Sequence, residues 1–366
     1  MPTPEGKPTI VIGAQLRKAR ELLGLTKEET AKEINVNPKD VDDWETDTSE
    51  PNLQQIESLA NLYGREIDYF LKVTANPPAK IKFRGKPGQS LRNLPKDTKV
   101  TLAKFDESCR AAVEFEGLLS KKREVKLPIF SATVDPVTSA RRIRDGFGLN
   151  DNPITDLRAL LEDSGVRVLV MLIPDEGLSG FSFWHEDYGP CILVHAKDTP
   201  GRRNFTLAHE LAHLVYRHGS CACYIPKEIG PHQERIEHKA NEFAVELLLP
   251  RNGVTLDFQR RNLPKEPSEK QLGQMANKWG ISIQALGYRL ESLNLIKQGL
   301  TKRIVEARPA FLRRPKIPTW ERRLGKSFVT TSIEAYQKNL ISVSRLAHAL
   351  QIPIRKAIEI VESGGR

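Results

Sequence analysis

The stretch that decides the fold and the chemistry of this 366-residue chain is residues 205–215, Phe-Thr-Leu-Ala-His-Glu-Leu-Ala-His-Leu-Val. No Gly or Pro interrupts this run, so it predicts a single helix. His209 and His213 stand four residues apart, which places them one above the other on a helix, with about 5 to 6 Å between their Cβ atoms. Two imidazoles at this spacing can bind one metal ion, and the pattern predicts zinc.

Glu210 follows the first histidine directly and is expected to point to the side of that ion. From there its carboxylate can take a proton from the attacking water and later hand it to the leaving amine. This is the role of the glutamate in H-E-x-x-H metallopeptidases. The motif therefore predicts Glu210 as the catalytic residue of a site that hydrolyses peptide bonds.

A second predicted helix offers the third metal ligand, since a catalytic zinc usually has three protein ligands plus water. This helix covers residues 234–249, is amphipathic and stops at Pro250. We predict Glu237 as the ligand, with Glu234 as the alternative because it shares much of the same face. Asn241 lies one turn after Glu237 and is predicted to orient a ligand imidazole by a hydrogen bond.

Three short β-rich runs precede the metal helix, at residues 166–173, 181–184 and 191–195, with glycine-containing turns between them. We expect a small sheet with residues 192–195 as an edge strand, to which a substrate backbone can add. His218 and His232 are candidates for stabilising an oxyanion, but the preferred interpretation is that both are ordinary surface histidines.

The N-terminal part of the chain has a different organisation. Residues 10–72 carry apolar residues at helical spacing in five short blocks, which predicts five helices. Thr26, with Glu29 three residues later, forms a capping box that opens the second helix, and residues 35–37 form the turn before the third. Two short helices joined by a tight bend are typical of a helix-turn-helix, whose second helix can enter the major groove of DNA.

The third predicted helix gives mixed evidence for DNA binding. Asn37, Lys39 and Asp40 at its start are expected to contact base edges, while Arg17, Lys18 and Lys27 are expected to contact phosphates. Asp42 and Asp43 follow, and such carboxylates repel a polyanion. The net charge of +10 lies mostly in residues 80–126 and 251–326. A helical module that binds another protein or dimerises is therefore the alternative.

Two parts of the chain resemble known families. Within residues 10–72, the pattern Leu-Thr-x-x-x-x-Ala, a turn, and Trp-Glu before a Pro resembles the XRE-type helix-turn-helix family and is carried by Leu25, Thr26, Ala31, Val36, Trp44, Glu45 and Pro51. Residues 139–296 resemble the ImmA/IrrE metallopeptidase family, through Arg-Asn-Phe-Thr-Leu-Ala-His-Glu-Leu-Ala-His at 203–213 and Glu-x-x-Ala-Asn-x-Phe-Ala-x-x-Leu-Leu-Leu-Pro at 237–250.

The second resemblance implies a zincin-like peptidase domain with three zinc ligands, His209, His213 and Glu237, and the catalytic residue Glu210. Ala212 stands where the family usually has Gly, and His195 where it more often has Asn. The resemblance also implies regulation by proteolysis, in which a DNA-binding repressor is cut or otherwise inactivated.

We therefore expect an α+β fold that is mostly α. The predicted parts are a five-helix helix-turn-helix domain at 10–72, a basic linker and helix at 73–126, a zinc peptidase domain at 139–296 and a helical region at 297–366. No run approaches the roughly 18 apolar residues that a membrane span needs, so we expect a cytoplasmic protein. The four cysteines are expected to be free thiols.

The predicted function is that of a zinc-dependent endopeptidase that acts on a regulatory DNA-binding protein. The partners expected are that protein substrate, DNA through the helix-turn-helix, and a second copy of the chain, since helix-turn-helix proteins of this kind are frequently dimers. The alternative is a helix-turn-helix regulator whose peptidase-like domain senses a ligand or a partner without cutting it.

Overall fold

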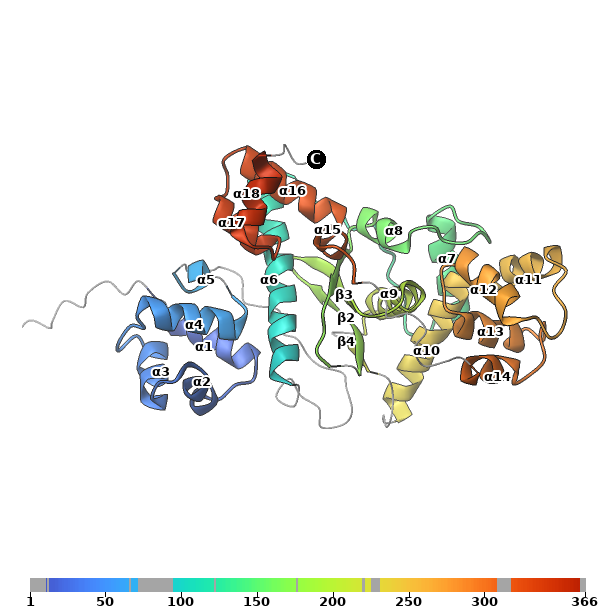
Figure 1. Cartoon of the computed structure of the whole chain (residues 1–366), viewed down its shortest axis with the longest axis horizontal. Helices are drawn as coiled ribbons and strands as arrows, with labels where there is room; N and C mark the ends of the chain where they lie inside the picture. The colour runs from blue at the N-terminus through green and yellow to red at the C-terminus, as the bar shows by residue number, and fades with distance from the viewer. Residues whose placement is uncertain are drawn as a thin grey trace, which may run out of the picture.

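The computed structural model describes residues 11, 13–65, 67–71, 95–121, 123–175, 177–218, 221–224, 231–307 and 317–362. Helices surround one four-stranded sheet (Figure 1). The expected α+β fold, mostly α, is confirmed. The predicted linker lies largely outside the described residues, and the helix expected within residues 73–126 is α6 (Lys96–Leu118).

The N-terminal part folds into the five helices that the sequence predicts: α1 (Gly13–Leu22), α2 (Lys27–Ile34), α3 (Pro38–Glu45), α4 (Leu53–Tyr63) and α5 (Ile67–Leu71). Thr26 and Glu29 form the predicted capping box at the start of α2. The bend between α2 and α3 passes through Asn35 in the left-handed conformation, with φ of 57°. Buried Ala31, Val41 and Trp44 join the helices in one small core.

The sheet contains β1 (Arg167–Met171), β2 (Leu178–His185), β3 (Gly189–His195) and β4 (Cys221–Tyr224), in the order β1-β3-β2-β4. β3 runs parallel to β1 and antiparallel to β2, and β2 pairs antiparallel with β4. The prediction that residues 192–195 form an edge strand is therefore wrong, because both sides of β3 are already hydrogen-bonded.

The two faces of the sheet belong to two different cores, because successive side chains of a strand point to opposite faces. Val168 and Val170 of β1 pack in the core around α9 (Pro200–Val215), whereas Leu169 and Met171 pack toward α6. Figure 1 shows α9 and α6 on opposite sides of the strands. On the α6 side, the ring of Phe105 meets those of Phe181 and Phe183 edge to face, and Cys109 and Cys191 are buried free thiols.

The remaining helices extend these two layers. On the α9 side lie α7 (Pro136–Gly146), α8 (Leu157–Asp163), α10 (Pro231–Leu248), α11 (Arg251–Arg260), α12 (Glu269–Lys278), α13 (Ile283–Ser292) and α14 (Leu300–Glu306). The last four are α15 (Trp320–Leu324), α16 (Lys326–Gln337), α17 (Val343–Ala349) and α18 (Ile354–Glu362). α16 and α17 pack against α6. No helix among the described residues is long and apolar enough to cross a membrane.

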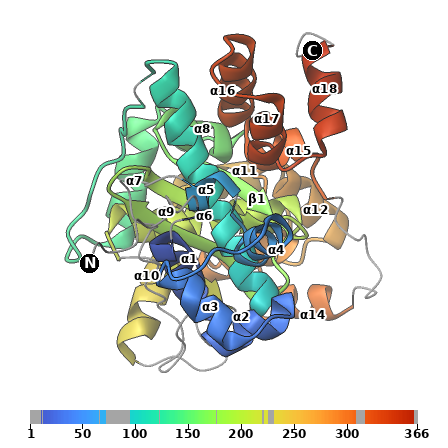
Figure 2. The same cartoon turned by 90° about the vertical axis from the view of Figure 1, so that its left-hand side faces the viewer.

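α6 joins the N-terminal domain to the rest of the molecule. Figure 2 shows α4 and the C-terminal helices along the same helix, and both groups contact it. Arg65, which follows α4, is completely buried, with its guanidinium nitrogens 2.7 Å from Asp106 and 3.1 Å from Glu107 of α6. The N-terminal domain is therefore tied to α6 by buried charges.

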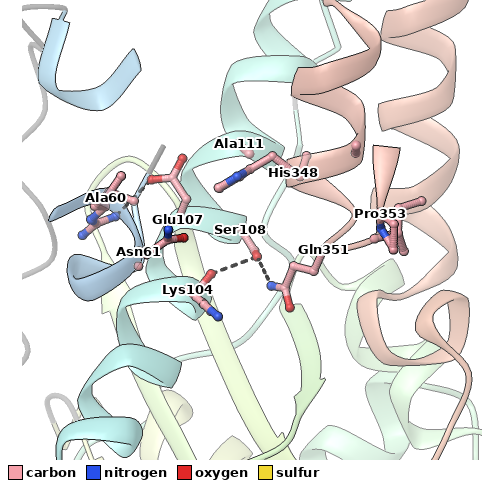
Figure 3. A pocket seen from close by; sticks show the side chains of 14 residues that line it. Ala60, Asn61, Lys104, Glu107, Ser108, Ala111, His348, Gln351 and Pro353 are labelled. Atoms are coloured by element: carbon pink, nitrogen blue, oxygen red, sulfur yellow. Dashed lines mark hydrogen bonds and ion pairs between the residues drawn. The ribbon is translucent and has the colours of Figure 1, made fainter. Parts of the chain in front are cut away.

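A cavity of about 360 Å³ lies beside this contact, between the end of α4, the middle of α6, and α17 with the turn that follows it (Figure 3). Gln351 donates a hydrogen bond to Ser108 within it, at 2.9 Å, and Asn61 and Lys104 also line it. None of the histidines and glutamates of the H-E-x-x-H region lines this cavity.

Candidate metal centre

The helix that carries the two histidines is α9, and it begins before the predicted run. Thr199 caps it by accepting a hydrogen bond from the backbone N–H of Arg202 at 3.3 Å, and Pro200 occupies the first turn. All side chains from Thr206 to Val215 are buried. The sequence places two histidines and a glutamate inside this buried segment, so polar groups must find partners there.

Three ligand atoms converge where α9 passes α10. Nε2 of His209 lies 3.0 Å from Nε2 of His213 and 3.1 Å from Oε2 of Glu237. Nε2 of His213 lies 3.6 Å from Oε1 of the same carboxylate. One ligand atom from each of the three residues falls within 4.8 Å of the others, so the three form a group that could hold a metal ion.

The structure brings together the residues that the sequence singles out for this group. Glu237 of α10 lies beside both imidazoles, whereas Glu234, the alternative ligand, is exposed one turn earlier and lies outside the group. Oδ1 of Asn241 lies 2.9 Å from Nδ1 of His209, on the side of the ring opposite Nε2. Asn241 is therefore within hydrogen-bond distance of the ring that it is predicted to orient.

Negative charge dominates the surroundings of the buried His209. Burial by itself lowers the pKa of this imidazole, but the hydrogen bond to Glu237 and the charges of Glu210 and Glu237 raise its pKa overall. The two carboxylates that favour a protonated imidazole here favour any cation at the same place. The electrostatics therefore suit a metal ion.

Glu210 has no exposed surface and faces β2. Oγ of Ser182 donates a hydrogen bond to its Oε2 at 2.5 Å. Gly180, two residues earlier on the same face, leaves room for the helix: a Cβ there would lie 2.8 Å from Oε1 of Glu210 and 2.4 Å from Cγ2 of Thr206. Ser182 was not predicted from the sequence, although small residues at 180 and 182 alternate there with Phe181 and Phe183.

Of the two histidines considered for oxyanion stabilisation, the structure describes the side chain of His218 and not that of His232. His218 is buried rather than on the surface, and its Nδ1 lies 3.1 Å from Nδ1 of His213. This is the side of the His213 ring away from the three converging ligand atoms, so the prediction for His218 is wrong. The side chain of His232 lies outside the described part of the chain.

His195, singled out because the family more often has Asn there, is buried and accepts a hydrogen bond at Nδ1 from the backbone N–H of Lys197 at 3.3 Å. Burial lowers its pKa. The neutral ring therefore caps the end of β3, which is a structural role.

Four of the residues predicted to contact DNA have side-chain partners within α1–α3: Asn37, Asp40, Arg17 and Lys27. Asn37 accepts a hydrogen bond from the backbone N–H of Lys39, and Asp40 accepts one from that of Asn37, which together form a capping box for α3. Lys27 pairs with Asp42, and Arg17 lies 3.7 Å from Glu45. The side chain of Lys39 is exposed and has no ion-pair partner among the described residues.

Comparison with known proteins matches two parts of the chain. Residues 161–291 match the IrrE N-terminal-like domain of the Peptidase_M78 family, and residues 16–70 match a helix-turn-helix family. Among curated proteins, the HTH-type transcriptional regulator ImmR of Bacillus subtilis (strain 168) is 32% identical over 60 residues. That match covers 16% of this chain and 47%, about half, of the relative. Both resemblances seen in the sequence are thus confirmed: an N-terminal XRE-type helix-turn-helix domain is followed by an IrrE-like domain that matches the Peptidase_M78 family.

Proposed function

We propose that this protein is a zinc-dependent endopeptidase that cleaves a DNA-binding regulatory protein and thereby controls transcription. The observation that carries the proposal is the convergence of His209, His213 and Glu237. The buried carboxylate of Glu210 supports it, because its charge acts on the imidazole of His209. Three ligands and a separate acid are the parts that metal-assisted peptide hydrolysis needs.

The donor set fits zinc. Two imidazole nitrogens and one carboxylate oxygen are the ligands of the His₂Glu catalytic zinc sites, which leave a fourth position open. We assign His209, His213 and Glu237 as the ligands, with Asn241 orienting His209. Zinc bound there would polarise the peptide carbonyl and make water acidic enough to be deprotonated near neutral pH.

Glu210 is the proposed catalytic residue. Its carboxylate takes a proton from the attacking water and delivers it to the leaving nitrogen of the cleaved peptide bond. The hydroxyl of Ser182 and the close backbone at Gly180 keep this carboxylate in one orientation.

The substrate is proposed to enter as an extended strand at β4. Because both sides of β3 are paired, strand addition needs another edge, and within the described residues β4 pairs only with β2. The two edge strands of the described sheet are β1 and β4. α9 lies against β2, β3 and β4, so the β4 edge is nearer to the metal helix than the β1 edge. An extended peptide that adds to an exposed edge is held by main-chain hydrogen bonds.

The helix-turn-helix domain is proposed to bring the peptidase to its target in the cytoplasm. We assign Asn37, Lys39 and Asp40 to base edges and Arg17 and Lys27 to phosphates, with a homodimer on the DNA. The similarity to a helix-turn-helix regulator supports DNA or a DNA-bound protein as the partner.

The test is co-expression with helix-turn-helix proteins encoded next to this gene. The wild type is expected to produce a truncated regulator, whereas Glu210→Gln is expected to bind zinc and leave the regulator intact. His238→Ala, which alters an exposed histidine beside Glu237, is the control that keeps cleavage. Cleavage by zinc-loaded Glu210→Gln would remove the proposed role of Glu210. An intact regulator with zinc-loaded wild type would favour the alternative of a regulator with a sensing domain.

A further inference from the structure

We propose that His218 is a positioning residue for the metal centre: it holds the ring of His213 so that Nε2 of His213 faces His209 and Glu237. The inference rests on the proposed metal centre but does not require peptidase activity. The observation that carries it is the distance of 3.1 Å between the Nδ1 atoms of His213 and His218.

The end of α9 delivers His218 to this position. Tyr216 caps the helix, and Arg217 adopts the left-handed conformation, with φ of 52°. The backbone N–H of His218 then donates to the carbonyl of His213 at 3.0 Å, and that of Arg217 to the carbonyl of Leu214 at 3.1 Å. This pair of bonds is a Schellman motif, which turns the chain back over the last turn of the helix.

The reversal explains how a residue five positions after His213 can reach its ring. In a continuing helix, positions five apart point in different directions, because each residue rotates the chain by a fixed angle. Here the helix ends before His218, so its side chain folds back behind His213. The two ring centroids lie 5.3 Å apart, at an interplanar angle of 66°.

The hydrogen bond between the two rings fixes the tautomer of His213. If Nε2 of His213 binds a metal ion, its Nδ1 carries the proton and donates, and Nδ1 of His218 accepts. His218 then carries its own proton on Nε2. A partner of this kind sets which nitrogen of a ligand histidine is free for the metal and holds the ring in place.

The ring of His218 is itself held in place. It stacks on the ring of Tyr216, with centroids 5.4 Å apart and an interplanar angle of 12°. The hydroxyl of Tyr216 donates to Oγ of Ser139 at 2.8 Å, at the start of α7. His218 is 8% exposed, so water does not compete strongly for its Nδ1. The acceptor is therefore preorganised before any metal ion binds.

His218 and Asn241 have the same role toward the two ligand histidines. Each accepts from Nδ1 of one of the two ligand histidines, and each leaves the Nε2 of that histidine facing the other ligands. Asn241 comes from α10 and His218 from the C-terminal turn of α9. Each ligand histidine is therefore held at Nδ1, on the side of its ring away from the three converging ligand atoms.

The test is the affinity of the full chain for zinc, measured by competition with a chromophoric chelator at fixed pH. His218→Phe keeps a planar ring but removes the acceptor, and is expected to weaken zinc binding by about 10- to 100-fold. His218→Gln, whose amide oxygen can accept, is expected to lose less. Exposed His238→Ala is the control, with wild-type affinity expected.

Cobalt substituted for zinc gives a second readout, because its visible absorption depends on ligand geometry. A changed Co²⁺ spectrum in His218→Phe, with an unchanged far-UV circular dichroism spectrum, supports positioning. Wild-type zinc affinity in folded His218→Phe would overturn the inference and leave the metal centre standing. A folded wild type that binds no zinc would overturn both the inference and the proposed function.

Discussion

Gly180 sets how closely the metal-binding helix can approach the sheet. A Cβ at this position would press on Thr206 and Glu210 of α9, at 2.4 and 2.8 Å. We therefore expect Gly180→Ala to lower the free energy of unfolding by about 1–3 kcal/mol, the usual cost of overpacking a dense interior. Urea denaturation of the variant and of the wild type measures the difference.

Gly117→Ala is the matched control for this substitution. Gly117 lies on the exposed side of α6, and a Cβ there meets nothing within 4 Å. Alanine costs less conformational entropy than glycine in a helix, so this variant is expected to gain up to about 1 kcal/mol. Equal losses in both variants would contradict the close approach at Gly180.

The residues of the metal group were predictable from the sequence because their spacing is local. His209 and His213 are one helical turn apart, and Glu237 and Asn241 are one turn apart on another helix. Ser182 was not predictable in this way, because it reaches Glu210 only through the packing of β2 on α9. The contact between His218 and His213 was not predicted, because it depends on the turn that ends α9, and helical periodicity does not reveal such a turn.

At the scale of elements, α3 depends on its own first turn. Asn37 is the N-cap residue of this helix and also a proposed base contact. Asn37→Ala is expected to destabilise the N-terminal domain by about 0.5–2 kcal/mol. Asn37→Ser keeps a capping oxygen, so it is expected to change the stability of the domain by only about a few tenths of a kcal/mol.

The same pair of variants separates capping from DNA reading. If Asn37 reads a base, both variants lose affinity for the operator, because neither serine nor alanine can form the paired amide contacts. Binding measured by fluorescence anisotropy at one fixed salt concentration distinguishes the two roles. If Asn37→Ser binds DNA with wild-type affinity, Asn37 caps α3 and does not read a base.

Most helices were predictable from the sequence, and their ends less so. The predicted start of the peptidase domain, residue 139, falls inside α7, which begins at Pro136 because Asp135 caps it by accepting from the backbone N–H groups of Val137 and Thr138. β4 was missed because four residues are too few to show alternation. The strand order was beyond reach, since residues 191–195 are equally apolar whether they lie at an edge or inside the sheet.

For the whole molecule, the contact between the N-terminal domain and α6 predicts sensitivity to acid. Burial raises the pKa of Glu107, but the charges of Arg110, Arg65 and Arg345 and a hydrogen bond from Arg110 outweigh it, and the pKa is about 2 instead of 4.5. The folded state therefore binds fewer protons at this group than the unfolded chain. Its contribution to stability is complete above about pH 4.5 and is lost as the pH falls toward 2.

Glu107→Gln tests this linkage, because the amide cannot titrate. Below pH 4.5, thermal unfolding midpoints of the wild type are expected to fall more steeply with decreasing pH than those of the variant, which starts from a lower midpoint at neutral pH. Parallel pH dependences for the two proteins would show that Glu107 is not held ionised by the three arginines.

The central claim is that His209, His213 and Glu237 hold one zinc ion between α9 and α10. The most direct measurement is the zinc content of the purified full chain by mass spectrometry of the metal, for the wild type, His209→Ala and the control His238→Ala. About one zinc per chain is expected in the wild type and in the control, and almost none in His209→Ala. A folded wild type without zinc, or full zinc content in His209→Ala, would contradict the claim.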